Sequence, residues 1–222
     1  MGDVKYKDIS GPDGVPDGVI DDYDKTNIGS PMPKFTFGWT NTFRYKNFDL
    51  SVFINGSYGN KVYNYLSMKL THMNSPWTNQ LNAVNGRAQL VPINPNKVYE
   101  DGTMWYNDVS NVMVANPGAS IPRATINDPN DNDRISDRYI EDGSYIRLKN
   151  ISLGYTFPKK TIDKLGLSNL RIYANIQNLL TITGYDGYDP EIGASTSSVN
   201  VYGLDNGRYP SPTVYSFGLN AV

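Results

Sequence analysis

Residues 34–60 read KFTFGWTNTFRYKNFDLSVFINGSYGN, and their side chains alternate between apolar and polar for almost the whole stretch. Successive side chains of a β-strand point to opposite faces of a sheet, so a period of two predicts strands. Two strands joined by a tight turn near Lys46 and Asn47 account for the pattern. One face of this hairpin would collect an apolar, largely aromatic set: Phe35, Phe37, Trp39, Phe43, Tyr45, Phe48, Leu50, Val52, Ile54 and Tyr58.

Three further segments near the C-terminus show the same alternation, at residues 151–157, 170–177 and 215–221. A partial strand is predicted at residues 4–7, which brings the expected number to about six. The link at residues 158–169 is short, and we expect a helical turn within it around residues 162–165. Residues 61–143 and 184–212 are long, polar and without sustained periodicity. We therefore expect long loops on one side of an antiparallel sheet and short turns on the other.

The composition agrees with β-structure and excludes several classes of function. Of 222 residues 39% are hydrophobic, and aromatic side chains are frequent, with 17 Tyr, 7 Phe and 3 Trp. The net charge is −2 and the charged residues are scattered along the chain, so the sequence shows no basic cluster of the kind that binds nucleic acid. The chain has no cysteine for disulfides or thiolate chemistry, and no run approaches the ~20 apolar residues of a membrane-spanning helix.

Alternation by itself also fits a soluble β-sandwich, which has one buried and one wet face. Three features favour a transmembrane β-barrel instead. The strands reach about ten residues, aromatic residues gather toward strand ends as in interfacial girdles, and short turns lie opposite long polar loops. Six strands would leave two open edges, and unpaired backbone groups are costly in hydrocarbon. We therefore expect the chain to be part of a larger barrel.

Six segments, which together reach both ends of the chain, carry a resemblance: GDVKYKD, DGVIDDYD, PKFTFGWTNTFRYKNFDLSVFINGSYGN, RYIEDGSYIRLKNISLGYTFPKK, LRIYANIQNLLTITGYDGYDPE and YPSPTVYSFGLN. In combination they resemble the C-terminal part of SusC/RagA-type TonB-dependent outer-membrane transporters. Residues 62–134 and 194–206, which lie between these segments, have the character of regions that vary within that family.

The resemblance implies an all-β fold in which residues 1–222 supply about six antiparallel strands of a 22-stranded transmembrane barrel. Residues 61–143 would form a long extracellular loop. It also implies an N-terminal plug, a SusD-type surface lipoprotein as a lid, and import of glycans or peptides driven by the TonB complex. The chain carries neither a plug domain nor a TonB-contacting segment. We therefore expect a non-enzymatic wall segment in contact with outer-membrane lipid of a Gram-negative bacterium.

Candidate substrate-binding residues lie in the long loops, because aromatic faces beside planar polar groups suit sugar rings. The predicted set is Trp77, Trp105, Tyr106, Tyr185, Asp186, Tyr188 and Asp189. Simple packing of the loops is the alternative interpretation of these aromatic residues. Catalysis has little support, since the lone His72 lies in a polar loop without a Ser or Cys motif, and we interpret it as a surface residue with no role.

Residues 13–24, DGVPDGVIDDYD, resemble a calcium-binding loop. Asp13, Asp17, Asp21 and Asp24 occupy positions 1, 5, 9 and 12 of the EF-hand template, and Gly18 occupies position 6. Val15 stands at position 3, where the template requires an oxygen ligand. A Gly/Pro turn with solvated carboxylates is the alternative to a Ca²⁺ site.

Three classes of function remain open at this point. One is the barrel segment of an outer-membrane nutrient importer, and another is a secreted β-sandwich that binds carbohydrate. The third, a hydrolase, would need measurable turnover and a carboxylate pair, such as Asp101 and Asp108 or Asp186 and Asp189, whose mutation abolishes it. A sandwich module would stay monomeric in buffer, whereas a barrel segment would aggregate or require detergent.

Overall fold

The computed structural model describes residues 1–192, 194–195 and 198–222. The chain divides into two compact units. Gly29–Asn64 and Ile140–Val222 form the first, here called the sheet unit, and Met1–Ile28 and Tyr65–Tyr139 form the second, here called the loop unit. Among the described residues, none of the helices is long and apolar enough to cross a bilayer.

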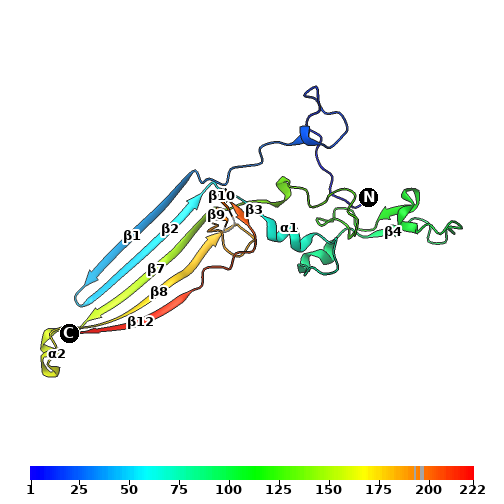
Figure 1. Ribbon diagram of the computed structural model, residues 1–222. Helices are drawn as coiled ribbons and strands as arrows, with labels where there is room; N and C mark the ends of the chain where they lie inside the picture. Colours follow the sequence, from blue (N-terminus) through cyan, green and yellow to red (C-terminus); the bar gives the residue numbers. More distant parts are fainter. Residues whose placement is uncertain (193, 196–197) are drawn as a thin grey trace. The chain divides into compact units, whose positions relative to one another are not determined.

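An antiparallel sheet is the main element of the sheet unit, and it has five strands in the part of the chain that the structure describes. Figure 1 shows them side by side in the order β1-β2-β7-β8-β12. The hairpin predicted from residues 34–60 is confirmed, with its turn at Lys46 and Asn47. The strand bounds are β1 Phe35–Tyr45, β2 Phe48–Tyr58, β7 Tyr145–Thr156, β8 Leu170–Thr183 and β12 Val214–Ala221.

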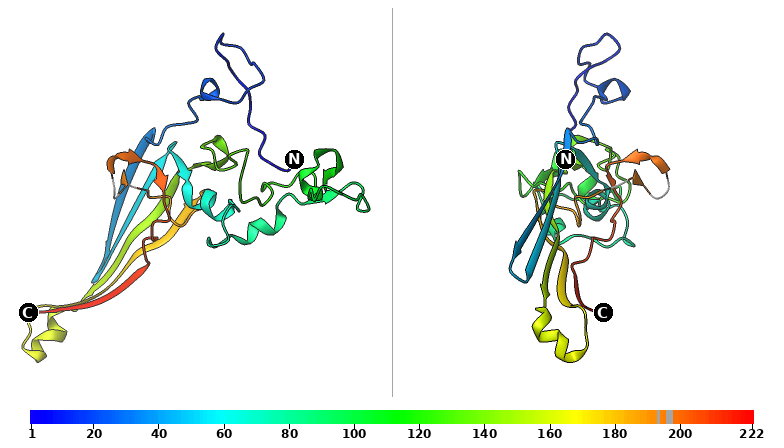
Figure 2. Two further views of the ribbon diagram at one scale, coloured as in Figure 1. Left: turned by 45° about the vertical axis from the view of Figure 1, so that its right-hand side comes forward. Right: turned by 90° about the vertical axis from the view of Figure 1, so that its left-hand side faces the viewer.

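Smaller elements lie at the two ends of these strands. The short link between β7 and β8 holds the expected helical turn, as α2 (Lys159–Ile162) and a 3₁₀ turn (Asp163–Leu165). At the opposite end of the strands lies a small sheet of β11 (Leu204–Asp205), β3 (Lys61–Asn64) and β6 (Ile140–Asp142). The pair of β9 (Ala194–Ser195) and β10 (Ser198–Tyr202) is also at that end (Figure 2). Within the sheet unit the short turns and the starts of the long loops thus lie at opposite ends of the strands, as expected.

The loop unit contains little regular structure. It holds the helix α1 (Tyr65–Thr71) and the antiparallel pair of β4 (Leu90–Pro92) and β5 (Val112–Val114). Five 3₁₀ turns lie in its described residues: Asp22–Asp24, Asn82–Gly86, Trp105–Asn107, Val109–Asn111 and Asp137–Tyr139.

The partial strand predicted at residues 4–7 is wrong. The backbone of Val4 is paired with side chains instead of a neighbouring strand: its N–H donates to Asn132 Oδ1 (2.8 Å), and its carbonyl accepts from Asn130 Nδ2 (2.9 Å). Asparagine amides satisfy the groups that a strand ladder would use. Among the described residues the main sheet therefore has five strands rather than the expected six.

The register of the main sheet gives it one mainly polar and one mainly apolar face. Residues paired across antiparallel strands share a face, so each row of partners can be followed from β1 to β12. One row is entirely polar: Thr42, Ser51, Ser152, Asn175 and Ser216. The adjacent row on the other face is apolar: Phe43, Leu50, Leu153, Ala174 and Phe217.

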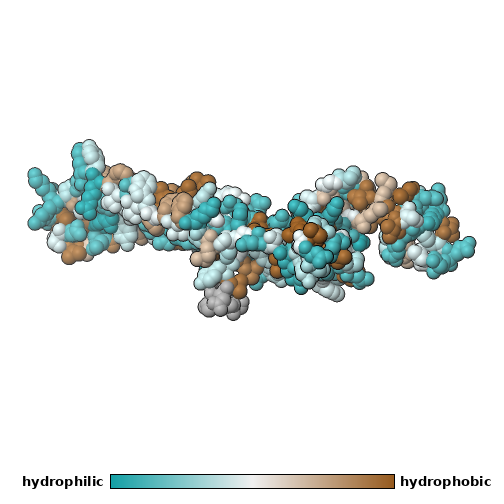
Figure 3. Space-filling model, turned by 90° about the horizontal axis from the view of Figure 1, so that it is seen from above, coloured by the Kyte–Doolittle hydropathy of each residue, from teal (hydrophilic) through white to brown (hydrophobic). Residues whose placement is uncertain are grey.

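The apolar face is largely exposed. Trp39 keeps 59% of its surface accessible and Phe217 keeps 84%, although both are large hydrophobic residues. Figure 3 shows hydrophobic side chains at the surface, between polar ones, on the face of the molecule that it displays. A soluble sandwich would bury this face against a second sheet, whereas a barrel wall presents it to lipid.

Aromatic pairs mark both ends of the apolar face. Phe35 stacks on Tyr58 (5.3 Å between ring centroids) at the loop end, and Phe48 packs against Tyr155 (4.7 Å) at the turn end. The 11 residues of β1 measure about 36 Å along the strand at ~3.3 Å per residue. At the usual tilt of ~40° this length projects to about 28 Å, enough to cross the ~25 Å apolar band of outer-membrane barrels.

A β-bulge in β7 interrupts the alternation. Phe53 pairs with Asn150 but the next residue, Ile54, pairs with Leu148, so Lys149 is the extra residue. An unbroken period of two from Ile151 would place Arg147 on the apolar face. Because of the bulge, Arg147 lies on the polar face instead.

Candidate functional site

An ion pair crosses the polar face near its turn end. Arg171 of β8 donates from Nε and Nη2 to the two carboxylate oxygens of Asp49 on β2, at 3.2 and 2.6 Å. The pair passes over Gly154 of β7, where a Cβ atom would collide with both partners. Glycine at this position therefore lets a bidentate bridge connect two strands that are not neighbours.

A second charged cluster lies at the loop end of the polar face, around Arg147 of β7. Only 3% of the Arg147 side chain is exposed. Its Nη2 donates to Asp189 Oδ1 (2.5 Å), its Nη1 to Glu191 Oε2 (2.6 Å), and its Nε to Thr181 Oγ1 (2.8 Å). Lys149, the bulge residue, adds a second bond to Glu191 Oε2 (2.8 Å).

This cluster fixes the loop that follows β8. The carboxylate of Asp189 also accepts backbone N–H groups of Glu191 (2.9 Å) and Ser211 (3.0 Å). Two segments of chain, before and after β9 and β10, are thus held by one buried carboxylate. Sequence reasoning did not select Arg147, Lys149 or Glu191, since an unbroken alternation places Arg147 on the wrong face.

The pH dependence of stability follows from Asp189. Burial opposes its ionisation, but bonds from the backbone N–H groups of Ser211 and Glu191 and from Arg147 outweigh burial and lower its pKa below 3.8. A carboxyl group whose pKa is lower in the folded than in the unfolded protein stabilises the fold. This contribution is complete above the unfolded-state pKa and is lost as the pH falls through the folded-state pKa. We expect the stability difference between wild type and Asp189→Asn to be constant from pH 7 to 5 and to shrink below pH ~3.8. Thermal unfolding across this range measures it, and a constant difference down to pH 2 would contradict the assignment.

Tyr185 is a buried anchor rather than a free ligand-binding face. Its hydroxyl donates to Asp205 Oδ2 (2.6 Å), and both side chains are buried. Burial and the bond to the Asp205 carboxylate raise the pKa of Tyr185 far above its ordinary value. Of the four residues predicted in GYDGYDPE, Tyr185 and Asp189 are therefore enclosed, whereas Asp186 is exposed and Tyr188 keeps 65% of its surface accessible.

The other three predicted substrate-binding residues belong to the loop unit. Trp77 is 93% exposed, and Trp105 packs edge-to-face on Tyr106 (5.7 Å). The seven residues of the prediction are thus divided between the two units. Tyr188 and Asp186 are the accessible members in the sheet unit, and in sequence they lie close to Asp189, the buried partner of Arg147.

The acidic loop is folded by its own carboxylates. Asp24 Oδ1 accepts the N–H groups of Ile9 (2.7 Å) and Ser10 (3.2 Å), and its Oδ2 accepts that of Asp21 (2.9 Å). Asp21 Oδ1 accepts from Tyr23 N (2.8 Å) and Asp17 Oδ1 from Val19 N (2.9 Å), whereas Asp13 is exposed.

His72 is not the surface residue that we expected. It is 6% exposed, and Asp128 and Asp133 lie against its two ring nitrogens. The polarity of the surrounding sequence misled the prediction, because polar side chains enclose this ring.

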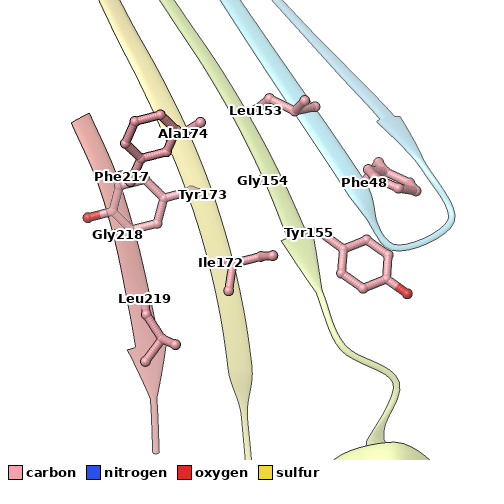
Figure 4. A pocket seen from close by; sticks show the side chains of 10 residues that line it. All are labelled: Phe48, Leu153, Gly154, Tyr155, Ile172, Tyr173, Ala174, Phe217, Gly218 and Leu219. Carbon is pink, nitrogen blue, oxygen red and sulfur yellow. The ribbon is translucent and has the colours of Figure 1, made fainter. Parts of the chain in front are cut away.

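A depression lies on the apolar face of the sheet unit. It measures about 560 Å³ and is open to the outside, with walls from β2, β7, β8 and β12 (Figure 4). Gly154 and Gly218 form part of its floor between Leu153, Ile172 and Phe217. An apolar hollow on a face that would contact lipid suits an acyl chain better than a polar nutrient.

Comparisons with known proteins agree with this arrangement. No family model matches the chain. TonB-dependent receptor P3 of Formosa agariphila is 36% identical to this chain, and the match covers 91% of this chain and 18% of the receptor. TonB-dependent receptor P26 of the same organism is 32% identical, and the match covers 100% of this chain and 20% of the receptor. TonB-dependent receptor SusC of Bacteroides thetaiotaomicron is 29% identical over 91% of this chain and 16% of SusC. The chain thus spans about a fifth of the length of these relatives.

Solved structures show the same fold. The RagAB peptide importer in its closed-closed state matches with a TM-score of 0.62, at 20% identity, over 94% of this chain and 20% of that chain. Its open-open state matches with a TM-score of 0.58 over 94% of this chain and 19% of that chain. TonB-dependent receptors are outer-membrane proteins of Gram-negative bacteria and are not enzymes, as we expected. Over nearly its whole length the chain therefore matches a segment of TonB-dependent receptors, SusC among them.

Proposed function

We propose that this chain is part of the barrel wall of a TonB-dependent outer-membrane importer that takes up oligosaccharides or peptides with a SusD-type surface lipoprotein. The strands span the bilayer, the turn at Lys46 and Asn47 faces the periplasm, and the long loops face the outside. Parts of the protein beyond this segment supply the plug and the contact with the TonB complex.

One observation supports this function above all: the sheet has one apolar face with aromatic ends and one polar face. The apolar rows match a lipid-facing wall, and the polar rows with their ion pairs match the lining of a wet lumen. The rival β-sandwich needs a second sheet over the apolar face. In the described part of the chain that face is exposed, which favours the importer.

The substrate path of this proposal includes the loop after β8. The Arg147 cluster and the bond from Tyr185 to Asp205 hold this loop rigidly, and Tyr188 and Asp186 are its accessible side chains. A rigid support lets an exposed aromatic ring stack on a sugar or peptide group at low entropic cost.

We expect Tyr188→Ala to reduce uptake by the whole transporter about five- to tenfold, as the loss of roughly 1 kcal/mol of stacking contact would do. Uptake of labelled oligosaccharides and peptides by cells that carry only the variant measures the effect and distinguishes the two substrate classes. Tyr202→Ala is a matched control, because Tyr202 is also an exposed tyrosine of the sheet unit. Unchanged uptake in Tyr188→Ala would remove this residue from the path.

We further propose that the acidic loop at residues 13–24 binds Ca²⁺. Asp8 strengthens the case, because its Oδ2 accepts Gly18 N (2.6 Å) while its Oδ1 is shielded from solvent without a hydrogen-bond partner. An oxygen ligand from Asp8 would compensate for Val15 at template position 3. A cation would neutralise the carboxylates that gather in this loop.

Calorimetric titration of the transporter with Ca²⁺ tests the loop. We expect a dissociation constant of ~10⁻⁴–10⁻³ M, as in other extracellular calcium modules, and its loss in Asp17→Asn. Asp163→Asn, which changes an aspartate in the turn after α2, is the control. Absence of binding heat at millimolar Ca²⁺ would contradict the site.

A further inference from the structure

His72 follows directly after α1 in the loop unit, and its imidazole is enclosed by polar groups. The backbone N–H of His72 donates to Met68 O (3.0 Å), which continues the helical turn, and the side chain is only 6% exposed. Each ring nitrogen faces one carboxylate: Nε2 faces Asp128 and Nδ1 faces Asp133. The two contacts differ in length, and the difference carries chemical information.

The contact with Asp128 is a hydrogen bond. Nε2 lies 2.7 Å from Asp128 Oδ2, which is an ordinary distance for a charge-assisted N–H···O bond. Asp128 is nearly inaccessible, and its oxygens also accept the backbone N–H (2.7 Å) and side-chain amide (2.6 Å) of Asn132. This carboxylate is therefore fixed as an acceptor, and it places the ring proton on Nε2.

The contact with Asp133 is different. Nδ1 lies 3.4 Å from Asp133 Oδ2, beyond the 2.7–3.2 Å range of N–H···O hydrogen bonds. Asp133 Oδ2 therefore lies opposite the second ring nitrogen without an ordinary hydrogen bond to it, and the separation leaves room for an ion that contacts both atoms.

The separation fits a tetrahedral metal ion. Nitrogen and oxygen ligands bound at ~2.1 Å to a tetrahedral Zn²⁺ lie about 3.4 Å apart, whereas the ~2.7 Å of a hydrogen bond is too short for a pair of ligands. Imidazole is a ligand for zinc-like ions and not for Ca²⁺ or Mg²⁺. In the described part of the chain, His72, Asp128 and Asp133 are the one group of three such residues with potential ligand atoms within 4.8 Å of one another.

The residues around the ring supply the outer support that metal-binding histidines require. A carboxylate on the distal ring nitrogen fixes the tautomer and orients the ring, and Asp128 has this position. Asn132 orients Asp128 in turn, and it is itself held by bonds to Val4 N (2.8 Å) and Asp3 Oδ1 (3.1 Å). Arg123 completes the chain through its bond to Asp3 (3.0 Å).

We propose that His72 Nδ1 and Asp133 Oδ2 bind a divalent cation of the zinc class, with Asp128 as the orienting carboxylate on Nε2 and water in the remaining positions. The ion joins the end of α1 to the segment around residues 128–133. It serves as a structural staple in a unit that has little regular secondary structure of its own. Asp133 is 34% exposed, which gives the ion and its water ligands a route to solvent.

Metal titration of the whole transporter tests the site. The protein, purified in detergent without a histidine tag and stripped with a chelator, is titrated with Co²⁺ and, by equilibrium dialysis, with Zn²⁺. We expect wild type to bind one more ion per chain than Asp133→Asn, with the intense visible absorption of tetrahedral Co²⁺ at this extra site. Asp137→Asn, an exposed aspartate in the following turn, should keep the ion. Asp128→Asn should weaken binding about 10- to 100-fold, as the loss of an orienting carboxylate does elsewhere.

Circular dichroism and thermal unfolding establish that each variant is folded. Asp133→Asn is close to isosteric and partly exposed, so it should fold like wild type without metal and lose the rise in melting temperature on addition of Zn²⁺. Equal numbers of bound ions in wild type and Asp133→Asn, or no binding at millimolar Zn²⁺ by folded wild type, would overturn the proposal.

Discussion

Replacing Val52 by arginine is expected to destabilise the transporter by about 2–4 kcal/mol, the cost of a basic side chain at the midplane of a lipid-facing strand. Val52 lies about midway between the aromatic ends of β2, Phe48 and Tyr58. Its row across the sheet contains Ile151, Ile176 and Tyr215, with Asn41 as the one polar member. Denaturant unfolding of the protein in lipid vesicles measures the free energy.

The neighbouring residue supplies the control. Ser51 lies on the opposite face, in the polar row with Ser152 and Asn175, so Ser51→Arg should change the unfolding free energy by less than about 1 kcal/mol. Comparable losses in both variants would show that the two faces do not differ in their surroundings. A larger loss for Ser51→Arg would contradict the orientation of the sheet.

Replacing Arg147 by methionine is expected to cost about 3–5 kcal/mol, because it leaves the buried carboxylate of Asp189 without its charged partner. Asp189 is nearly inaccessible and sits 2.5 Å from the guanidinium. We expect the loop at residues 184–192 to detach from β7 in this variant. Denaturant unfolding measures the loss, and limited proteolysis should show new cleavage within that loop.

Lys149→Met is the matched control for this prediction. Lys149 also bonds to Glu191, but both side chains are about one-third exposed, so the change should cost no more than about 1 kcal/mol. If Arg147→Met cost no more than Lys149→Met, the buried cluster would not be what anchors the loop.

Much of the sheet could be predicted from the sequence, because each long strand carries an uninterrupted alternation over at least part of its length. The hairpin of β1 and β2 was placed with its turn and both faces correct. The alternation did not predict the parts of β7 and β8 nearest the long loops. In β7 the bulge at Lys149 interrupts the period of two. In β8 the matching irregularity lies at Asn178, which adopts a positive φ of 52°. The alternation of apolar and polar residues cannot show where a bulge leaves one residue unpaired, so it cannot predict the strand beyond that residue.

The site was harder to predict, because its partners are distant in sequence. Arg147 and Asp189 are 42 residues apart, and His72 and Asp128 are 56 residues apart. Composition identified the loops as polar but gave no sign of which polar groups become buried. Tyr185 was selected for its aromatic ring, and only the bond to Asp205 shows that this ring is enclosed.

The central claim is that the apolar face of the sheet contacts lipid while the polar face lines a wet lumen. The chain has no cysteine, so single cysteines at Val52 and Ser51 can be spin-labelled in this segment without competing sites. Electron paramagnetic resonance in the outer membrane then compares collision of each label with oxygen, which concentrates in lipid, and with a water-soluble nickel complex. We predict that the label at Val52 collides mainly with oxygen and the label at Ser51 does not. A label at Val52 that is reached readily by the nickel complex and poorly by oxygen would contradict the account.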